Sequence, residues 1–202
     1  MHALNVRVIQ DSLFSRPETW AAIATVAAVL VALFGKLFSR RFLERSRLEP
    51  EPNIHVARHP GNGDPNDATY FRLGVLNNSS NRLGQAKDVV VTVESKSPDP
   101  NDNFIPAPLE WTHRGALGIT INPNQRVMLD ICRWWKPERD HNYYVHLRCP
   151  TMDGQPIAAL AQGNTTLLLR VSQDSGVGKQ WKITVSWPKM DKPPQVELTS
   201  SL

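Results

Sequence analysis

Few residues of this 202-residue chain have the types and spacing that catalysis or metal binding requires. His55 and His59 are four residues apart, a spacing that suits a metal only when both side chains lie on one helix face, and Pro60 follows them directly. His146 and Cys149 are three residues apart in a predicted strand, so their side chains should point to opposite faces. We therefore expect neither a metal nor a cofactor.

A partial phosphate-loop pattern occurs near the C-terminus, at residues 176–179 (Gly-Val-Gly-Lys). Gln173 stands where such a loop needs its first glycine, and the segment that follows alternates like a strand rather than opening a helix that would hold phosphate. We predict a hairpin turn there instead. The isolated carboxylates occur in turn-like segments, where aspartate usually caps the backbone: Asp64, Asp67, Asp99 and Asp102. These patterns do not indicate an enzyme.

The strongest candidate for a binding surface is the segment at residues 133–139, RWWKPER. Adjacent residues of a strand point to opposite faces, so at least one of Trp134 and Trp135 should lie outside the core. Trp and Arg also dominate the energetics of protein interfaces. The alternative is that one tryptophan is core and the other covers the edge of the domain. The predicted partner contacts are Arg133, Trp134, Trp135, Lys136 and Arg139, which suit an acidic protein surface, anionic lipid headgroups or a nucleotide base.

An apolar segment precedes this part of the chain. From Trp20 to Phe34 the sequence is WAAIATVAAVLVALF, in which only Thr25 is polar. Extended to Phe38, a helix of roughly 19 residues would span about 28 Å, close to the thickness of a hydrocarbon core. A capping box at residues 15–18 (Ser-Arg-Pro-Glu) predicts where the helix starts, and Pro50 and Pro52 would end it near Leu48. We predict one transmembrane helix.

Basic residues follow the apolar segment, whereas only Arg7 and Arg16 precede it. By the positive-inside rule the N-terminus should face out and the C-terminal domain should lie in the cytoplasm, at the inner membrane. Formal glycosylation tripeptides at Asn77, Asn78 and Asn164 argue against this orientation, but such tripeptides are common by chance. The expected contacts with lipid headgroups are Lys36, Arg40, Arg41, Arg45 and Arg47. A stripe of small residues suits packing of one helix copy on another: Ala24, Ala28, Ala32 and Gly35.

Beyond Pro52 the hydrophobic period changes from 3.6 to 2, which is typical of strands. Turn residues separate the alternating segments, and no helical pattern lies between them. Such a series predicts a mainly β domain, either an antiparallel immunoglobulin-like sandwich or a small β-barrel. The predicted strands cover residues 54–57, 69–76, 87–93, 119–121, 126–132, 143–149, 165–172 and 181–187.

Two segments resemble parts of bacterial immunoglobulin-like domains. Residues 73–95, LGVLNNSSNRLGQAKDVVVTVES, are similar to the opening strand–loop–strand, and residues 140–146 resemble a tyrosine corner with Tyr144 in the key position. Cys132 and Cys149 are too close in sequence for the disulfide between sheets, so we expect free thiols in a reducing compartment. The resemblance covers residues 53–188. With the apolar helix, it extends to uncharacterised bacterial single-pass membrane proteins, and it implies no reaction.

These patterns divide the chain into a tail (1–14), a transmembrane helix with a basic extension (15–49), an immunoglobulin-like domain (50–190) and a C-terminal tail (191–202). The net charge is +4, but much of the surplus lies beside the apolar segment, so nucleic acid is not the expected partner. We predict a non-catalytic membrane-anchored adaptor that binds the lipid bilayer and a protein partner, and self-associates through the helix. The alternatives are a nucleotide sensor in bacterial signalling or defence, and an extracytoplasmic adhesion module.

Overall fold

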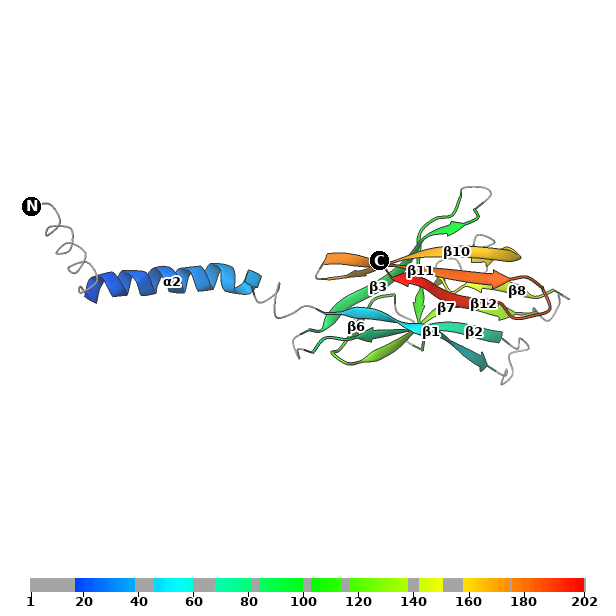
Figure 1. The fold of residues 1–202 in the computed structure, drawn as a ribbon, viewed down its shortest axis with the longest axis horizontal. Coiled ribbons are helices and arrows are strands. Elements are labelled where there is room, and N and C mark those ends of the chain that lie inside the picture. The colour runs from blue at the N-terminus through cyan, green and yellow to red at the C-terminus, as the bar shows by residue number, and fades with distance from the viewer. Residues whose placement is uncertain are drawn as a thin grey trace, which may run out of the picture. The chain divides into compact units, whose positions relative to one another are not determined.

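The computed structural model describes residues 17–38, 46–59, 68–80, 84–99, 103–113, 117–137, 142–150, 158–174 and 176–201. The chain divides into two compact units, residues 1–44 and residues 45–202 (Figure 1). The first unit contains a helix and the second contains the strands.

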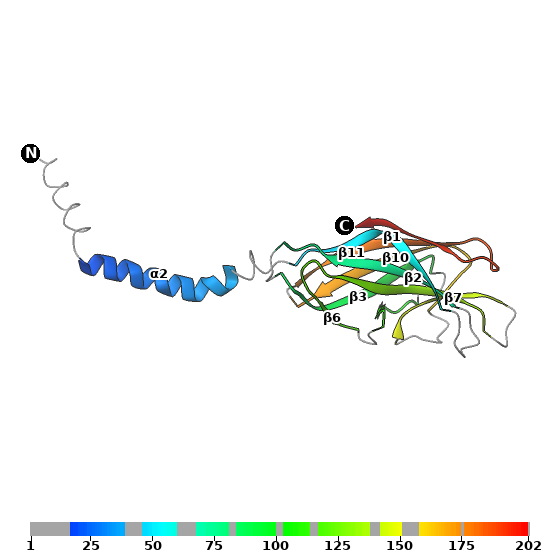
Figure 2. The same ribbon diagram turned by 90° about the horizontal axis from the view of Figure 1, so that it is seen from below.

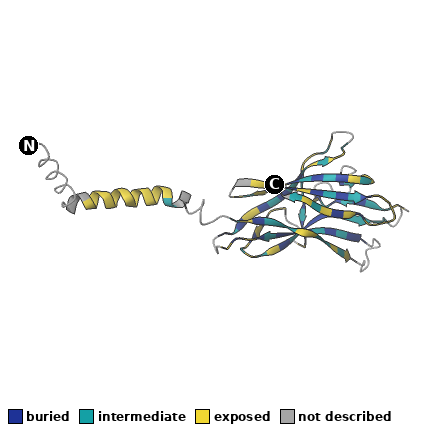
Figure 3. Cartoon of the chain, in the orientation of Figure 1, coloured by how far each residue is buried: buried dark blue, intermediate teal, exposed yellow. Residues whose placement is uncertain are grey.

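Helix α2 runs from Pro17 to Phe38, with proline in the first turn, where its missing N–H leaves no intrahelical bond unmade. The side chains from Trp20 to Phe34 are exposed along the helix (Figure 3). The Thr25 hydroxyl donates to the Ala21 carbonyl oxygen at 2.8 Å, so the helix satisfies its own polar side chain. The predicted membrane span is not found: no helix within the described residues combines the length and apolar character needed to cross a bilayer.

The strands form two antiparallel sheets, as the mainly β prediction requires, and the arrangement is consistent with a β-sandwich (Figures 1 and 2). The first sheet has the order β1 (Leu48–His59), β2 (Ala68–Asn77), β7 (Arg126–Trp135), β8 (Tyr144–Leu147) and β9 (Ala159–Leu160), with β5 (Glu110–Trp111) also paired to β7. The second has the order β12 (Gln195–Ser201), β11 (Gly176–Trp187), β10 (Gly163–Gln173), β3 (Ala86–Ser97) and β4 (Ala107–Pro108), with β6 (Ile119–Ile121) on β3.

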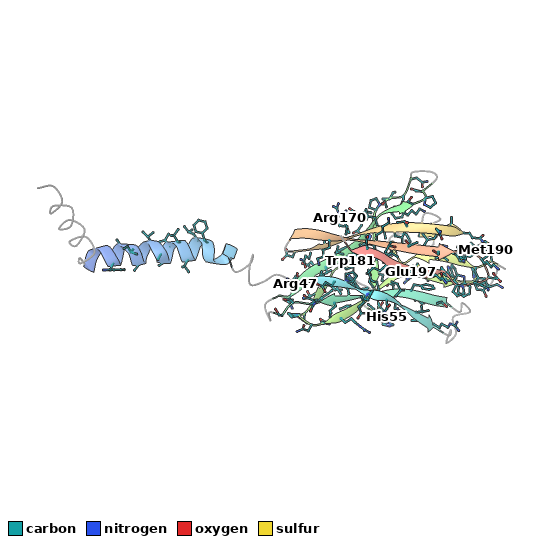
Figure 4. The ribbon with its side chains drawn as sticks, viewed as in Figure 1. Arg47, His55, Arg170, Trp181, Met190 and Glu197 are labelled. Atoms are coloured by element: carbon teal, nitrogen blue, oxygen red, sulfur yellow. The ribbon has the colours of Figure 1, made fainter. Side chains whose placement is uncertain are left out.

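A single apolar core receives alternate side chains from both sheets. Leu73 and Val75 of β2 are fully buried, as are Val89, Val91 and Val93 of β3 and alternate residues of β11. Trp111 and Trp181 are the largest fully buried side chains, and Figure 4 shows Trp181 within the body of the domain. The Trp111 indole N–H lies 3.2 Å from the Val89 carbonyl oxygen and 3.1 Å from that of Leu117. The alternating apolar pattern of the sequence therefore corresponds to inward-facing positions.

Two predicted boundaries are wrong. Strand β1 begins at Leu48, so the predicted helix cannot continue to that residue, and the β unit begins at Arg45 rather than residue 50. Pro50 and Pro52 lie inside β1, which is an edge strand whose register shifts between Pro50 and Ile54, so the missing N–H groups break no central ladder. Residues 191–202, predicted as a tail, contain β12, which pairs with β11 along Gln195–Ser201.

The ends of both sheets limit further strand addition. β4 and β9 have only two residues each, which leaves little backbone for another chain to pair with. At the other side, β1 is interrupted by its register shift and lies beside β12, the edge of the second sheet, in both views (Figures 1 and 2). The described edge strands therefore do not favour pairing with a strand of another chain.

Asn77 joins the start of the domain to two loops. Its Oδ1 accepts from the Arg47 backbone N–H at 3.1 Å, and its Nδ2 donates to the carbonyl oxygens of Gly84 at 2.7 Å and Ile121 at 3.0 Å. The Asn78 N–H donates back to the Arg47 carbonyl oxygen at 2.7 Å. Because Asn77 is fully buried, its amide nitrogen is not open to glycosylation in the folded domain.

Candidate functional site

The register of β7 against its neighbours sets the directions of the two adjacent tryptophans. Trp134 lies opposite Val145 of β8, which is buried, whereas Trp135 lies opposite Tyr144, which is half-buried. Trp134 packs against the core, and Trp135 belongs to the outward-facing row. The expectation that at least one tryptophan leaves the core agrees with this alternation.

Trp135 is surrounded by polar and aromatic side chains on the outward face of the first sheet. The Arg133 guanidinium carbon lies 4.7 Å from the centroid of the Trp135 ring. His146 meets the Trp135 ring edge-on at 6.1 Å between centroids, and Tyr144 meets His146 in the same way at 6.0 Å. We call Arg133, Trp135, Tyr144 and His146 the outer cluster. Cation–π and edge-to-face contacts of this kind hold their members in defined positions.

Trp134 forms a separate stack. Its ring lies nearly parallel to that of Tyr143, with 4.3 Å between centroids and an interplanar angle of 8°. The Lys136 ammonium lies 5.6 Å from the Tyr143 centroid, and no described residue forms an ion pair with it. The stack thus connects the apolar core, through Trp134 and Tyr143, to the half-buried Lys136.

Charged pairs border the outer cluster on the same face. Arg72 Nε lies 2.8 Å from Asp130 Oδ1, which also accepts from the Thr112 hydroxyl at 2.6 Å. Arg148 pairs with Glu110, the residue that precedes Trp111 on β5. Both arginines also lie near the Tyr70 ring, at 5.6 Å and 5.7 Å from its centroid. The carboxylates Asp130 and Glu110 are therefore each matched by a guanidinium.

The other predicted site residues are less completely described. Arg139, Arg40, Arg41 and Arg45 lie outside the described residues, and for Lys36 only the helical backbone is described. Arg47 is exposed where the chain enters the domain, as Figure 4 shows. Ala24, Ala28 and Ala32 are exposed on α2, and Gly35 is half-buried. Asp140 and His141 of the proposed tyrosine corner also lie outside the description.

The neighbours of the two tryptophans could not be identified from the sequence pattern. They are Tyr144 and His146 of β8 and Tyr143, the residue before β8, and the register of β7 against β8 brings them to Trp134 and Trp135. Tyr144 and His146 alternate with the buried Val145 and Leu147, and that alternation was the one available signal that they face outward.

Both cysteines are free thiols, as predicted, and both are buried. Burial raises the pKa of Cys149 to about 12 from its ordinary value of 9.0, although nearby Arg148 opposes this. Burial also raises the pKa of Cys132 well above 9.0. Neither thiol is suited to act as a nucleophile near neutral pH, because nucleophilic attack requires the thiolate.

The raised pKa values of the thiols predict a loss of stability at high pH. Above pH 9 the unfolded chain releases the thiol protons while the folded domain retains them, so the unfolding free energy should fall, by up to about 1.4 kcal/mol per pH unit for each thiol. Urea unfolding at pH 8, 9.5 and 10.5 measures this slope. In a protein with Cys132→Ala and Cys149→Ala the slope should be shallower, and an unchanged slope would assign it to other groups.

The remaining candidate motifs have structural roles. Residues 176–179 lie at the start of β11, where Gly176 pairs with Gln173 of β10, so the predicted hairpin is confirmed. His55 Nε2 lies 2.7 Å from Glu51 Oε2, and Glu51 also pairs with Arg126. The outer cluster and the adjoining stack therefore remain the candidate binding surface, because Trp, Tyr and Arg side chains contact one another there. No protein-family model, curated protein or solved structure matches this chain.

Proposed function

We propose that this protein is a non-catalytic interaction protein that α2 attaches to a lipid bilayer, and whose β domain offers a binding surface to a protein partner. The observation that carries the attachment is the exposure of large apolar side chains on α2. Ile23 is 45% exposed and Val31 is 71% exposed, with Trp20, Val26, Val29, Leu30, Leu33 and Phe34 between these values. Contiguous apolar surface of this extent normally marks contact with a membrane or a partner.

Lipid accounts for this exposure better than a protein groove does. A helix that docks in a groove has one apolar stripe and one polar face, whereas α2 carries apolar residues around its circumference between Trp20 and Phe34. Its polar Thr25 bonds to the helix backbone, as groups in hydrocarbon must. The basic residues at positions 36, 40, 41, 45 and 47 then favour a cytoplasmic location for the domain.

Membrane fractionation of the full chain tests the attachment. The protein should stay with the membranes through alkaline carbonate extraction, and a variant with Val29→Asp and Leu33→Asp should be released, because each central charge costs about 2.5–3.5 kcal/mol in a bilayer. Val56→Asp is the matched control, since Val56 is similarly apolar and 60% exposed but belongs to β1. Release of the unmodified protein by carbonate would refute the attachment.

Orientation and fold class form two further parts of this proposal. A reporter fused to the C-terminus should read as cytoplasmic, whereas an exported reporter would favour the adhesion alternative. We assign the domain to the immunoglobulin-like class, supported by two antiparallel sheets that share one core. Binding of nucleotides by the purified full chain would instead favour the sensor alternative.

A further inference from the structure

We propose that the outer cluster, together with Lys136, is a docking surface for an acidic segment of a partner protein. This inference rests on the proposed role of the domain as an interaction module and specifies its surface and the chemistry of its partner. It is supported by the position of the outer cluster within the domain, by the charges beside Trp135 and by the contacts that Trp135 makes.

The outer cluster and the start of the domain lie at opposite ends of β2. The chain enters beside Asn77, at the end of β2 that pairs with Leu48, whereas Trp134 and Trp135 lie at the other end, where Trp134 faces Thr69. The eight steps along β2 from Thr69 to Asn77 correspond to about 26 Å of strand. Within the domain, the outer cluster is therefore well separated from Leu48, at the start of β1.

Positive charge exceeds negative charge beside the outer cluster. The nearby carboxylates Asp130 and Glu110 each pair with an arginine, and no described residue forms an ion pair with Lys136. Arg133 adds a guanidinium spread over the Trp135 ring. The face thus presents positive charge beside aromatic rings, which complements a segment that carries carboxylates next to apolar side chains.

The side chains of this surface are held in place before a partner binds. One chain of contacts runs from Arg133 through Trp135 and His146 to Tyr144, and a second, beside it, runs from Trp134 through Tyr143 to Lys136. A surface whose long side chains are held before binding loses less conformational entropy when a partner arrives. Trp, Tyr and Arg are also the residues in which interface hot spots are richest.

Protein suits this face better than nucleic acid. A nucleic-acid site needs a run of positive charge along the phosphate backbone, and here Asp130 and Glu110 interrupt it on the same sheet. An acidic peptide segment needs only local complementarity, which Lys136 supplies beside the aromatic rings. We therefore commit to a protein partner and treat oligonucleotide and lipid binding as outcomes that overturn the proposal.

The test uses the full chain in nanodiscs of phosphatidylcholine, with a fluorescent poly-glutamate peptide of about 20 residues as the probe. We expect saturable binding that weakens with added salt. Trp135→Ala and Lys136→Glu should each weaken it by roughly tenfold. Lys182→Glu is the matched control, because Lys182 is an exposed lysine on the outward face of β11 in the second sheet, and it should change binding less than twofold.

Each other outcome counts against the docking surface. Unchanged binding by Lys136→Glu, which leaves the aromatic contacts in place, or an equal loss by Lys182→Glu, would show that the probe senses only overall charge. A 20-nucleotide oligothymidine or phosphatidylglycerol nanodiscs could instead bind more tightly than the poly-glutamate peptide, with the same dependence on Trp135. That result would overturn the protein partner in favour of nucleic acid or lipid. Carbonate extraction of the same variants reports separately on attachment, so failure of one proposal is distinguishable from failure of the other.

Discussion

Replacing Asn77 with Ala should lower the unfolding free energy by about 2–5 kcal/mol, although the residue lies in a segment that looks like a polar turn. The substitution removes two donors and one acceptor from a fully buried position. The Arg47 N–H and the carbonyl oxygens of Gly84 and Ile121 then lose a partner, and each buried group left unsatisfied costs about 1–3 kcal/mol. Urea unfolding monitored by tryptophan fluorescence measures the change.

Asn78→Ala is the matched control for this prediction. Asn78 is the adjacent residue of the same type, but its side chain is exposed and bonds only to Glu49, at 3.2 Å, among the described residues. Its loss should cost less than about 0.5 kcal/mol, as exposed substitutions usually do. Equal destabilisation by the two substitutions would show that the Asn77 hydrogen bonds do not account for the effect.

The β strands could be predicted because their burial follows from short-range alternation. β6 is observed at the predicted residues, and β2, β3, β10 and β11 extend the predicted segments by one to five residues at their ends. β4, β5, β9 and β12 were not predicted, and in β12 only Val196 and Leu198 alternate with polar residues. Two apolar residues are too few to indicate a strand, and β12 forms because β11 already offers an open edge for pairing.

The local sequence carries little information about long-range polar contacts. Nothing in the sequence around Asn77 distinguishes it from Asn78, and its burial follows from three segments meeting: residue 47, residue 84 and residue 121. In the same way, the residue types of Trp134 and Trp135 indicated a binding surface, but the side chains that contact them depend on the register of β7 against β2 and β8. A shift of one residue in that register would exchange their faces.

The spacing of His55 and His59 also shows that a sequence motif is informative only when the local structure is known. His55 and His59 have metal-like spacing, yet the described contact of His55 is with Glu51, which also pairs with Arg126. Residues four apart lie about 6 Å apart on a helix face, but in a strand such as β1 they are about 13 Å apart along one face of the sheet. That separation is too large for two side chains to bind one metal ion, so the spacing indicates a metal site only in a helix.

The two adjacent tryptophans should differ in their effect on stability. Trp134→Ala should lower the unfolding free energy by about 2–4 kcal/mol, because it removes a ring that packs against the core and stacks on Tyr143. Trp135→Ala should cost about 1 kcal/mol, since its described contacts are one cation–π pair with Arg133 and one ring edge with His146. Parallel urea titrations of the two variants and the unmodified protein give both values.

Phe substitutions separate ring packing from the indole N–H. Neither indole nitrogen has a hydrogen-bond partner among the described residues, so Trp134→Phe and Trp135→Phe lose ring area but no hydrogen bond. Trp134→Phe should therefore recover part of the stability lost in Trp134→Ala, because a smaller ring can still stack on Tyr143. If Trp135→Ala destabilises the domain as strongly as Trp134→Ala, Trp135 is part of the scaffold, and the outer cluster loses its role as a surface held ready for a partner.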